Sequence, residues 1–292
     1  MKAAALAYAR ATSVDNALEL LASLGDRAKV LSGGQSLVPA MNLRLISPEL
    51  LVDIGGIVEL REIVVRGDTL RIGALARHVD LLRSPEVAAH APLLAEAVAE
   101  VAHPAIRNRG TLGGSLAHAD PAAELPACMV ALDAIIITRG QGGERRIAAG
   151  DFFRGIFQTA MSAEELLVAV DLPIARKGSV DYFHEFSRRH GDFAIAGLAA
   201  HAIVAEGMFS SLRLAFFGVG DRPVCASAAN GLLNTAVTSE LISQASAALA
   251  DELEPQDDQQ ASGAMRLHLA RVLLGRCIAA LLGRGDLAGG AA

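Results

Sequence analysis

The chain has 292 residues, which is long for one domain and suits two or three modest domains. Hydrophobic residues make up 52% and charged residues 20% of it, a composition that can bury a substantial core. The net charge of −6 argues against a nucleic-acid partner, because binding a phosphate backbone needs a basic face.

Three cysteines, Cys128, Cys225 and Cys277, lie far apart and form no C-x-x-C motif. Such isolated cysteines are usually small core residues, so we expect neither an iron–sulfur cluster nor another metal site on this chain. The N-terminus lacks a signal-peptide pattern, and no uncharged apolar run reaches transmembrane length. These features predict a soluble, cytoplasmic protein without a transmembrane segment.

The first 55 residues show alternating strand and helix patterns. A helix is expected to begin after the hydroxyl residues around Ser13 and to end at Gly25, because apolar residues recur between them at helical spacing. Strands are expected at 4–9, 29–32 and 50–54. This β-α-β pattern predicts a small subdomain over residues 1–55.

Residues 56–174 are expected to form a second subdomain. It opens with a hairpin in which Gly67 and Asp68 supply the turn between strands at 63–65 and 70–73. Further elements are expected as helices at 79–82, 92–101 and 122–132 and as strands at 134–138, 145–147 and 166–172.

A polar linker at 175–179 leads into a different pattern. Three apolar runs predict a three-stranded antiparallel meander, and two longer runs with helical spacing predict helices. The strands are expected at 182–186, 194–204 and 212–219, and the helices at 239–250 and 263–282. We therefore expect a C-terminal domain over 178–286 and an α+β fold for the whole chain.

Paired glycines follow the strand at 29–32. Gly33 and Gly34 carry no Cβ, so this turn can adopt positive φ and let backbone N–H groups converge on an anion, and Ser36 adds a hydroxyl that can cap a following turn. Alone, such a turn is usually an ordinary tight loop. A second Gly-Gly-Ser stands at 113–115. Two such segments are what a pyrophosphate needs in order to be held from both sides.

Four segments resemble the FAD-binding medium subunits of molybdenum hydroxylases, the relatives of xanthine dehydrogenase and aerobic carbon monoxide dehydrogenase. They are SGGQSLVP at 32–39, MNLRL at 41–45, TLGGS at 111–115 and DPAAEL at 120–125. The resemblance covers nearly the whole chain in order and spacing. It implies a two-part FAD-binding domain of the PCMH type, like that of vanillyl-alcohol oxidase, followed by a C-terminal domain of the carbon monoxide dehydrogenase flavoprotein type.

The resemblance also implies which residues bind FAD. The glycine segments match the family's two FAD loops, a carboxylate at Glu124 contacts the sugar or ribityl part with Asp120 in the same loop, and Leu167 contacts the flavin ring. By themselves, such acids often serve only a helix dipole and such a leucine is usually core. The expected FAD-binding residues are Leu31, Ser32, Gly33, Gly34, Gln35, Ser36, Leu37, Thr111, Gly113, Gly114, Ser115, Asp120, Glu124 and Leu167.

A further segment, FSRRHGDFA at 186–194, resembles the family's basic run ahead of the domain that covers one side of the flavin. Relatives often carry a lysine just before this run, where this chain has His184 or Glu185. A cationic role near the ring is therefore not expected here. No catalytic residue is expected, because the chain lacks the G-x-S-x-G, H-E-x-x-H and Walker motifs.

The function implied by the resemblance is that of the FAD subunit of a heterotrimeric molybdenum hydroxylase, assembled as a dimer of heterotrimers. A large subunit would oxidise substrate at a molybdopterin cofactor, a small subunit would carry two iron–sulfur clusters, and FAD here would pass electrons to an external acceptor. Gln35, where carbon monoxide dehydrogenases often have histidine, favours an organic substrate such as an N-heterocycle or aldehyde. The alternatives are a self-contained FAD-dependent oxidase of the vanillyl-alcohol oxidase type and a non-catalytic nucleotide-binding or scaffolding subunit.

Overall fold

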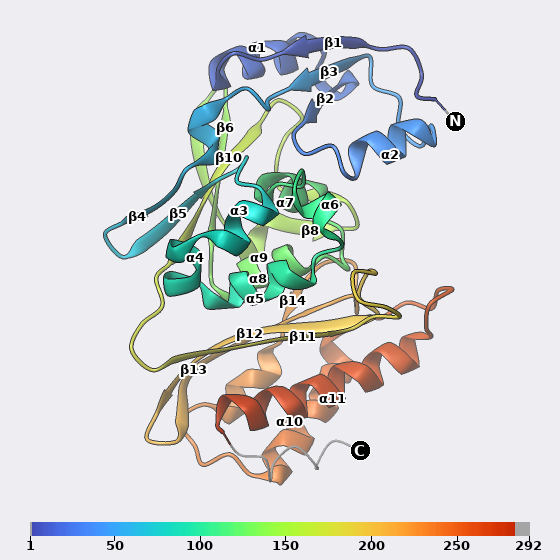
Figure 1. Cartoon of the computed structure of the whole chain (residues 1–292). Helices are drawn as coiled ribbons and strands as arrows, with labels where there is room; N and C mark the ends of the chain where they lie inside the picture. Colours follow the sequence, from blue (N-terminus) through green and yellow to red (C-terminus); the bar gives the residue numbers. More distant parts are fainter. Residues whose placement is uncertain (1, 284–292) are drawn as a thin grey trace.

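The computed structural model describes residues 2–283, so the last residues of the expected C-terminal domain, 284–286, lie outside the described part. The chain builds three tiers, each organised around its own β-sheet, that follow one another from the N-terminus to the C-terminus (Figure 1). Within the described residues, no helix is both long enough and apolar enough to cross a membrane.

The N-terminal tier is a parallel sheet in the order β1-β3-β2. Its elements are β1 (Ala7–Arg10), α1 (Val14–Leu24), η1 (Gly25–Arg27), β2 (Ala28–Leu31), α2 (Leu37–Asn42), β3 (Leu50–Asp53) and η2 (Val58–Arg61). Helix α1 begins as expected, where Ser13 accepts a bond from the N–H of Asn16, and it ends at Gly25, whose φ is 53°. The small core beneath α1 also includes Leu75 and Leu166 from the next tier.

The middle tier is a five-stranded antiparallel sheet in the order β4-β5-β10-β6-β7, with short helices against one face. The strands are β4 (Ile63–Arg66), β5 (Thr69–Gly73), β6 (Ile135–Gly140), β7 (Gly143–Ala148) and β10 (Leu166–Pro173), and a separate hairpin is formed by β8 (Phe153–Gly155) and β9 (Gln158–Thr159). The helices are α3 (His78–Arg83), α4 (Pro85–His90), α5 (Pro92–Glu100), α6 (Pro104–Arg107), α7 (Leu112–His118), α8 (Glu124–Ala131) and α9 (Ala149–Phe152). The expected hairpin at 63–73 and the expected strands at 134–138, 145–147 and 166–172 agree with the structure, whereas the β8–β9 hairpin was not predicted.

The C-terminal sheet has four antiparallel strands, so the prediction of three strands was wrong. The strands are β11 (Ser179–Phe186), β12 (Ala196–Ala205), β13 (Met208–Phe217) and β14 (Val224–Cys225), and they are followed by η3 (Ser227–Leu232), α10 (Ser239–Glu252) and α11 (Gly263–Leu281). The missed strand, β14, has two residues that pair with Ala215 and Phe216. Two residues are too few to show the alternation by which a strand is recognised.

The C-terminal sheet is buried on both faces. Alternate residues of β12, such as Leu198 and Ala200, pack against the core under α10 and α11, whereas Ala199 between them packs into the core of the middle tier. Figure 1 shows the same arrangement, with α10 and α11 below the sheet and the short helices of the middle tier above it. One face of this sheet therefore forms the junction with the middle tier.

Candidate functional site

The first glycine segment joins β2 to α2. Gly34 has φ of 72°, so this position needs a residue without a Cβ, and the side chain of Gln35 donates to the carbonyl of Gly33 across 3.0 Å. Ser36 stands at the N-cap of α2, yet its side chain makes no capping bond. Within residues 2–283, the N–H groups of 33–36 donate to no protein acceptor. The turn therefore presents a run of unpaired backbone donors.

The second glycine segment is the first turn of α7, which follows its N-cap, Thr111. The N–H of Gly113 donates to the carbonyl of Ala74 across 2.9 Å, and the N–H of Gly114 donates to Oγ1 of Thr111 across 3.1 Å. A Cβ on Gly113 would lie 2.6 Å from the Cβ of Ala74. The expected pyrophosphate donor at Gly113 is thus already bonded within the protein, and its glycine is needed for close packing.

The two glycine segments meet, although the residues that join them lie 79 positions apart in the chain. The hydroxyl groups of Ser32 and Thr111 are hydrogen-bonded across 2.7 Å. A Cβ on Gly33 would lie only 2.3 Å from the carbonyl oxygen of Arg109, so backbone packs directly on backbone there. The structure therefore brings together the two segments that the sequence singled out.

The two acids beyond α7 have different environments. Asp120 accepts a bond from the N–H of Ala122 across 2.9 Å and so shapes the turn before α8. Glu124 is the first residue of α8 and is 8% exposed. Burial raises the pKa of Glu124 to about 7, and the negative charges of Asp120 and Glu100 act in the same direction. Glu124 is thus a buried carboxyl close to the second glycine segment in sequence.

Two family models match this chain: the FAD binding domain in molybdopterin dehydrogenase over residues 3–175, and the CO dehydrogenase flavoprotein C-terminal domain over residues 181–281. The 6-hydroxypseudooxynicotine dehydrogenase complex subunit alpha of Paenarthrobacter nicotinovorans is 42% identical, over 97% of each chain. The structure is similar to that of carbon monoxide dehydrogenase from Hydrogenophaga pseudoflava, with a TM-score of 0.95 and 37% identity over 97% of this chain and 99% of that chain. It is also similar to quinoline 2-oxidoreductase from Pseudomonas putida 86, with a TM-score of 0.91 and 36% identity over the same shares.

The chain belongs to the FAD-binding medium subunits of the molybdopterin dehydrogenases. This family comprises flavin subunits of oxidoreductase complexes that contain several subunits. The resemblance carried by the glycine segments and by DPAAEL at 120–125 is therefore confirmed at the level of the family.

The residues of this medium subunit fit the pyrophosphate that joins the two halves of a flavin dinucleotide. The unpaired N–H groups at 33–36 and the hydroxyls of Ser32 and Thr111 are donors of the kind that a pyrophosphate requires. Leu167, in contrast, is 3% exposed and packs in the core of the middle tier. A core leucine would show the same burial, so the contact between Leu167 and the flavin ring stays a prediction.

Sequence reasoning missed a second carboxyl at the junction of the middle and C-terminal tiers. Phe183, two residues before Glu185 on β11, packs against the core of the middle tier, so alternation turns Glu185 toward the same side. Atom Oε2 of Glu185 is buried without a hydrogen-bond partner in the described chain. Burial, together with the charges of Glu124 and Glu100, raises the pKa of Glu185 to about 8. The sequence signal that could have revealed it is the alternation of side chains along β11, which places Glu185 on the same face as Phe183.

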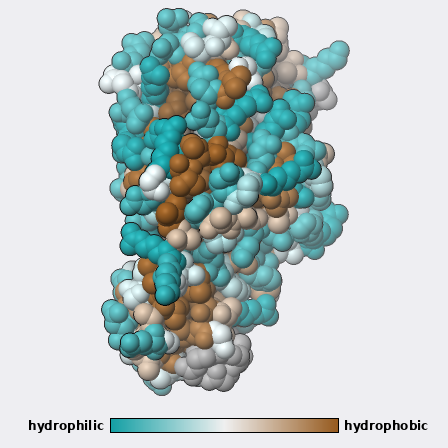
Figure 2. All heavy atoms as spheres, turned by 60° about the vertical axis from the view of Figure 1, so that its left-hand side comes forward, coloured by the Kyte–Doolittle hydropathy of each residue, from teal (hydrophilic) through white to brown (hydrophobic). Residues whose placement is uncertain are grey.

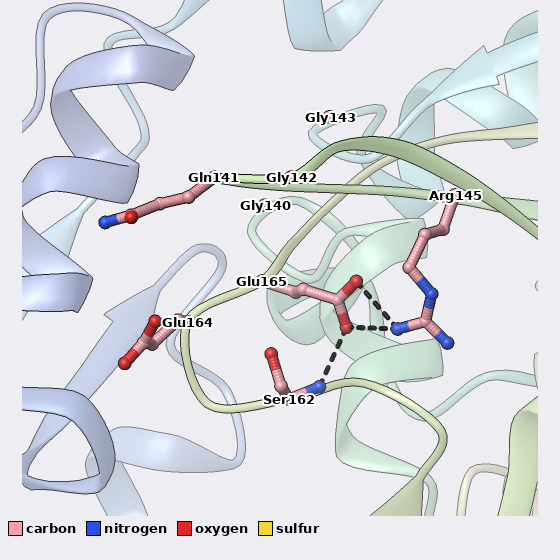
Figure 3. Close-up of a pocket in the computed structure, with 8 residues that line it drawn as sticks. All are labelled: Gly140, Gln141, Gly142, Gly143, Arg145, Ser162, Glu164 and Glu165. Carbon is pink, nitrogen blue, oxygen red and sulfur yellow. Dashed lines mark hydrogen bonds and ion pairs between the residues drawn. The ribbon is translucent and has the colours of Figure 1, made fainter.

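One hollow on the subunit does not involve the glycine segments. It has a volume of about 280 Å³ and lies between the β6–β7 turn and the residues before β10 (Figure 3). Glu165 there accepts bonds from Arg145 across 2.7 Å and from the N–H of Ser162 across 2.8 Å. Since the charges of Arg145 and Glu165 are paired with each other, we assign no ligand to this hollow.

Replacing Thr111 by valine is expected to lower the free energy of unfolding by about 1 kcal/mol, because α7 loses its N-cap. The same change removes the hydrogen bond to Ser32 that joins the glycine segments, so FAD affinity should fall as well. Thermal unfolding and titration with FAD measure the two effects. Thr238 provides the matched control, because it caps α10 in the same way, through the N–H of Leu241. FAD affinity that falls equally in Thr111→Val and Thr238→Val would contradict a local role for Thr111.

Proposed function

We propose that this subunit passes electrons through FAD, from iron–sulfur clusters on a small partner subunit to an external acceptor. A large partner subunit carries the molybdopterin cofactor at which substrate is oxidised, and the complex is a dimer of such heterotrimers. The observation that carries this proposal is the junction of the two glycine segments at Ser32 and Thr111, with unpaired N–H groups beside it. FAD supplies the redox chemistry, and this chain supplies binding and orientation.

Each group of residues has a proposed part in holding FAD. The N–H groups at 33–36 and the hydroxyls of Ser32 and Thr111 bind the pyrophosphate, and the carboxyl of Glu124 binds a sugar or ribityl hydroxyl. Leu31 and Leu37 lie half-buried at the two ends of the first segment and contribute apolar contact. The other proposed FAD-site residues are Gly33, Gly34, Gln35, Ser36, Gly113, Gly114, Ser115, Asp120 and Leu167.

The division of the chain is also a proposal. The ranges 1–55, 56–174 and 178–286 each contain one of the three main sheets. In this division the first two ranges hold FAD between them, and the third contributes the sheet that packs against the helices of the second. The junction of the glycine segments crosses the first boundary, which supports a cofactor site made by both parts.

The proposed substrate is a nitrogen-containing heteroaromatic compound, oxidised on the large subunit. Two relatives of this chain are named for such compounds, 6-hydroxypseudooxynicotine and quinoline. Gln35, in place of the histidine often found in carbon monoxide dehydrogenases, also favours an organic substrate.

The surface supports a role inside a larger complex. On the face shown in Figure 2, hydrophobic side chains gather in patches bounded by hydrophilic ones, and patches of this kind are typical of contact surfaces between subunits.

The experiment that tests this function compares the chain alone with the complex. The purified chain, given FAD, is expected to show a flavin absorption spectrum and no oxidation of N-heterocycles, whereas the complex oxidises them and bleaches the flavin under anaerobic conditions. Oxidation by the chain alone would favour the self-contained oxidase. A chain that takes up no FAD would favour the scaffolding role and contradict the proposal.

A further inference from the structure

Arg266, in the first turn of α11, is buried although it carries a charge that the FAD site as described does not use. Arg266 is 7% exposed. One of its guanidinium nitrogens, Nη1, donates to two backbone carbonyls. These are the carbonyl of Ile195, 2.6 Å away, and the carbonyl of Gly218, 2.7 Å away. The other nitrogen, Nη2, donates to Asp258 across 2.7 Å. One side chain therefore ties together two turns of the C-terminal domain.

The first of these turns is the loop between β11 and β12. The N–H of Ile195 donates to the carbonyl of Phe186 across 2.7 Å and closes the base of the loop. Within it, Gly191 has φ of 83°, and a Cβ there would lie 2.7 Å from a ring atom of His103. The loop thus lies directly on the segment that leads from α5 into α6 and on toward the second glycine segment.

The second turn follows β13. Gly218 has φ of 72°, and its N–H donates to the carbonyl of Pro121 across 2.8 Å. Pro121 belongs to the turn that Asp120 shapes immediately before Glu124. Through this bond the C-terminal domain is attached to the turn that contains Asp120 and leads into Glu124, the two acids proposed to bind FAD. The guanidinium of Arg266 is one hydrogen bond away from that contact.

This arrangement suits a role in positioning better than a role in stability. A buried cation loses its hydration, and its anionic partner here, Asp258, keeps a side chain that is 49% exposed, so the net gain from the pair is small. What arginine offers is a rigid planar fork with several fixed donors, which sets the spacing of the carbonyls that it binds.

We propose that Arg266 is a positioning residue for the FAD site, which fixes the 187–195 loop and the Gly218 turn against residues 102–103 and 120–121. The inference rests on the proposed function, since it assigns this role toward the cofactor held by those segments. It extends the site to a third part of the chain, because α11 belongs to the C-terminal domain.

The test uses the full chain with Arg266→Met and Arg266→Lys, and with Arg271→Met as the matched control. Arg271 lies in the same helix and donates to one carbonyl, that of Ser246, between α10 and α11. The readouts are FAD affinity, from fluorescence during titration of the flavin-free chain, the visible circular dichroism of bound flavin, and the thermal midpoint. Arg266→Met is expected to weaken FAD binding by about tenfold and to change the dichroism.

Arg266→Lys is expected to fall between Arg266→Met and the wild type, because lysine keeps the charge and three donors but not the fork. Arg271→Met is expected to change only the thermal midpoint. Wild-type affinity and dichroism in Arg266→Met would overturn the inference, whatever the thermal midpoint. If Arg266→Met does not fold, Arg266→Lys decides on the same two readouts. A wild-type chain that takes up no FAD would instead contradict the proposed function.

Discussion

Replacing Gly33 by valine is expected to abolish FAD binding, with a loss of affinity of roughly 100-fold or more. The new Cβ would lie 2.3 Å from the carbonyl oxygen of Arg109 and 2.9 Å from Cα of Gly110. Both atoms belong to the backbone, so no side chain can rotate away, and the two glycine segments must separate. Titration of the flavin-free chain with FAD measures the loss.

The control for this change is Gly142→Val. Gly142 lies in the exposed turn between β6 and β7, and a Cβ there meets no heavy atom within 4 Å. This variant should keep wild-type FAD affinity and a wild-type thermal midpoint. FAD bound by Gly33→Val as tightly as by Gly142→Val would show that the contact between the glycine segments is not part of the cofactor site.

Replacing Glu185 by glutamine is expected to stabilise the chain in alkaline solution by several degrees of thermal midpoint. The pKa of Glu185 rises from 4.5 to about 8 on folding, and the pKa of Glu124 rises from 4.5 to about 7. Between pH 4.5 and about pH 8 the folded state therefore binds more protons than the unfolded state, and the free energy of unfolding falls as pH increases. Glutamine resembles the protonated acid at every pH and removes the contribution of Glu185 to this fall.

Thermal unfolding at pH 5.5 and at pH 8.5 measures the effect. The wild type should lose more of its midpoint between the two conditions than Glu185→Gln, so the difference between the variants should be smaller at pH 5.5 than at pH 8.5. Glu164→Gln is the control, because Glu164 is exposed and its side chain points away from the paired Glu165 (Figure 3). Parallel pH dependence in the wild type and Glu185→Gln would rule out a charge conflict at the junction between the tiers.

The sequence predicted the elements whose patterns are local. The helix from Val14 to Leu24 follows from its apolar spacing and its cap at Ser13, and the hairpin around Gly67 follows from its turn residues. The two glycine segments were also found in this way, because each is a short contiguous motif. Their direct contact through Ser32 and Thr111 was expected only from the chemistry of a pyrophosphate, which needs donors on both sides.

What the sequence could not predict depends on tertiary packing. The N–H of Gly113 is occupied because Ala74, from another segment, lies above the first turn of α7. Glu185 looks like one more polar residue in an alternating strand, and its partial burial and its exposure to the charge of Glu124 follow from the docking of the C-terminal sheet. Three bonds, from Arg266 to Ile195 and Gly218 and from Gly218 to Pro121, join segments too far apart in sequence for any local pattern to encode.

The core of the N-terminal tier has a consequence for how the chain melts. Leu75 and Leu166, which belong to the middle tier, complete that core beside residues of α1. Removal of residues 1–55 would leave these two leucines facing water, and the parallel sheet on its own would lack part of its interior. The two tiers should therefore unfold in one cooperative step, so that hydrogen exchange gives the same free energy of opening for the amides of β3 and β10.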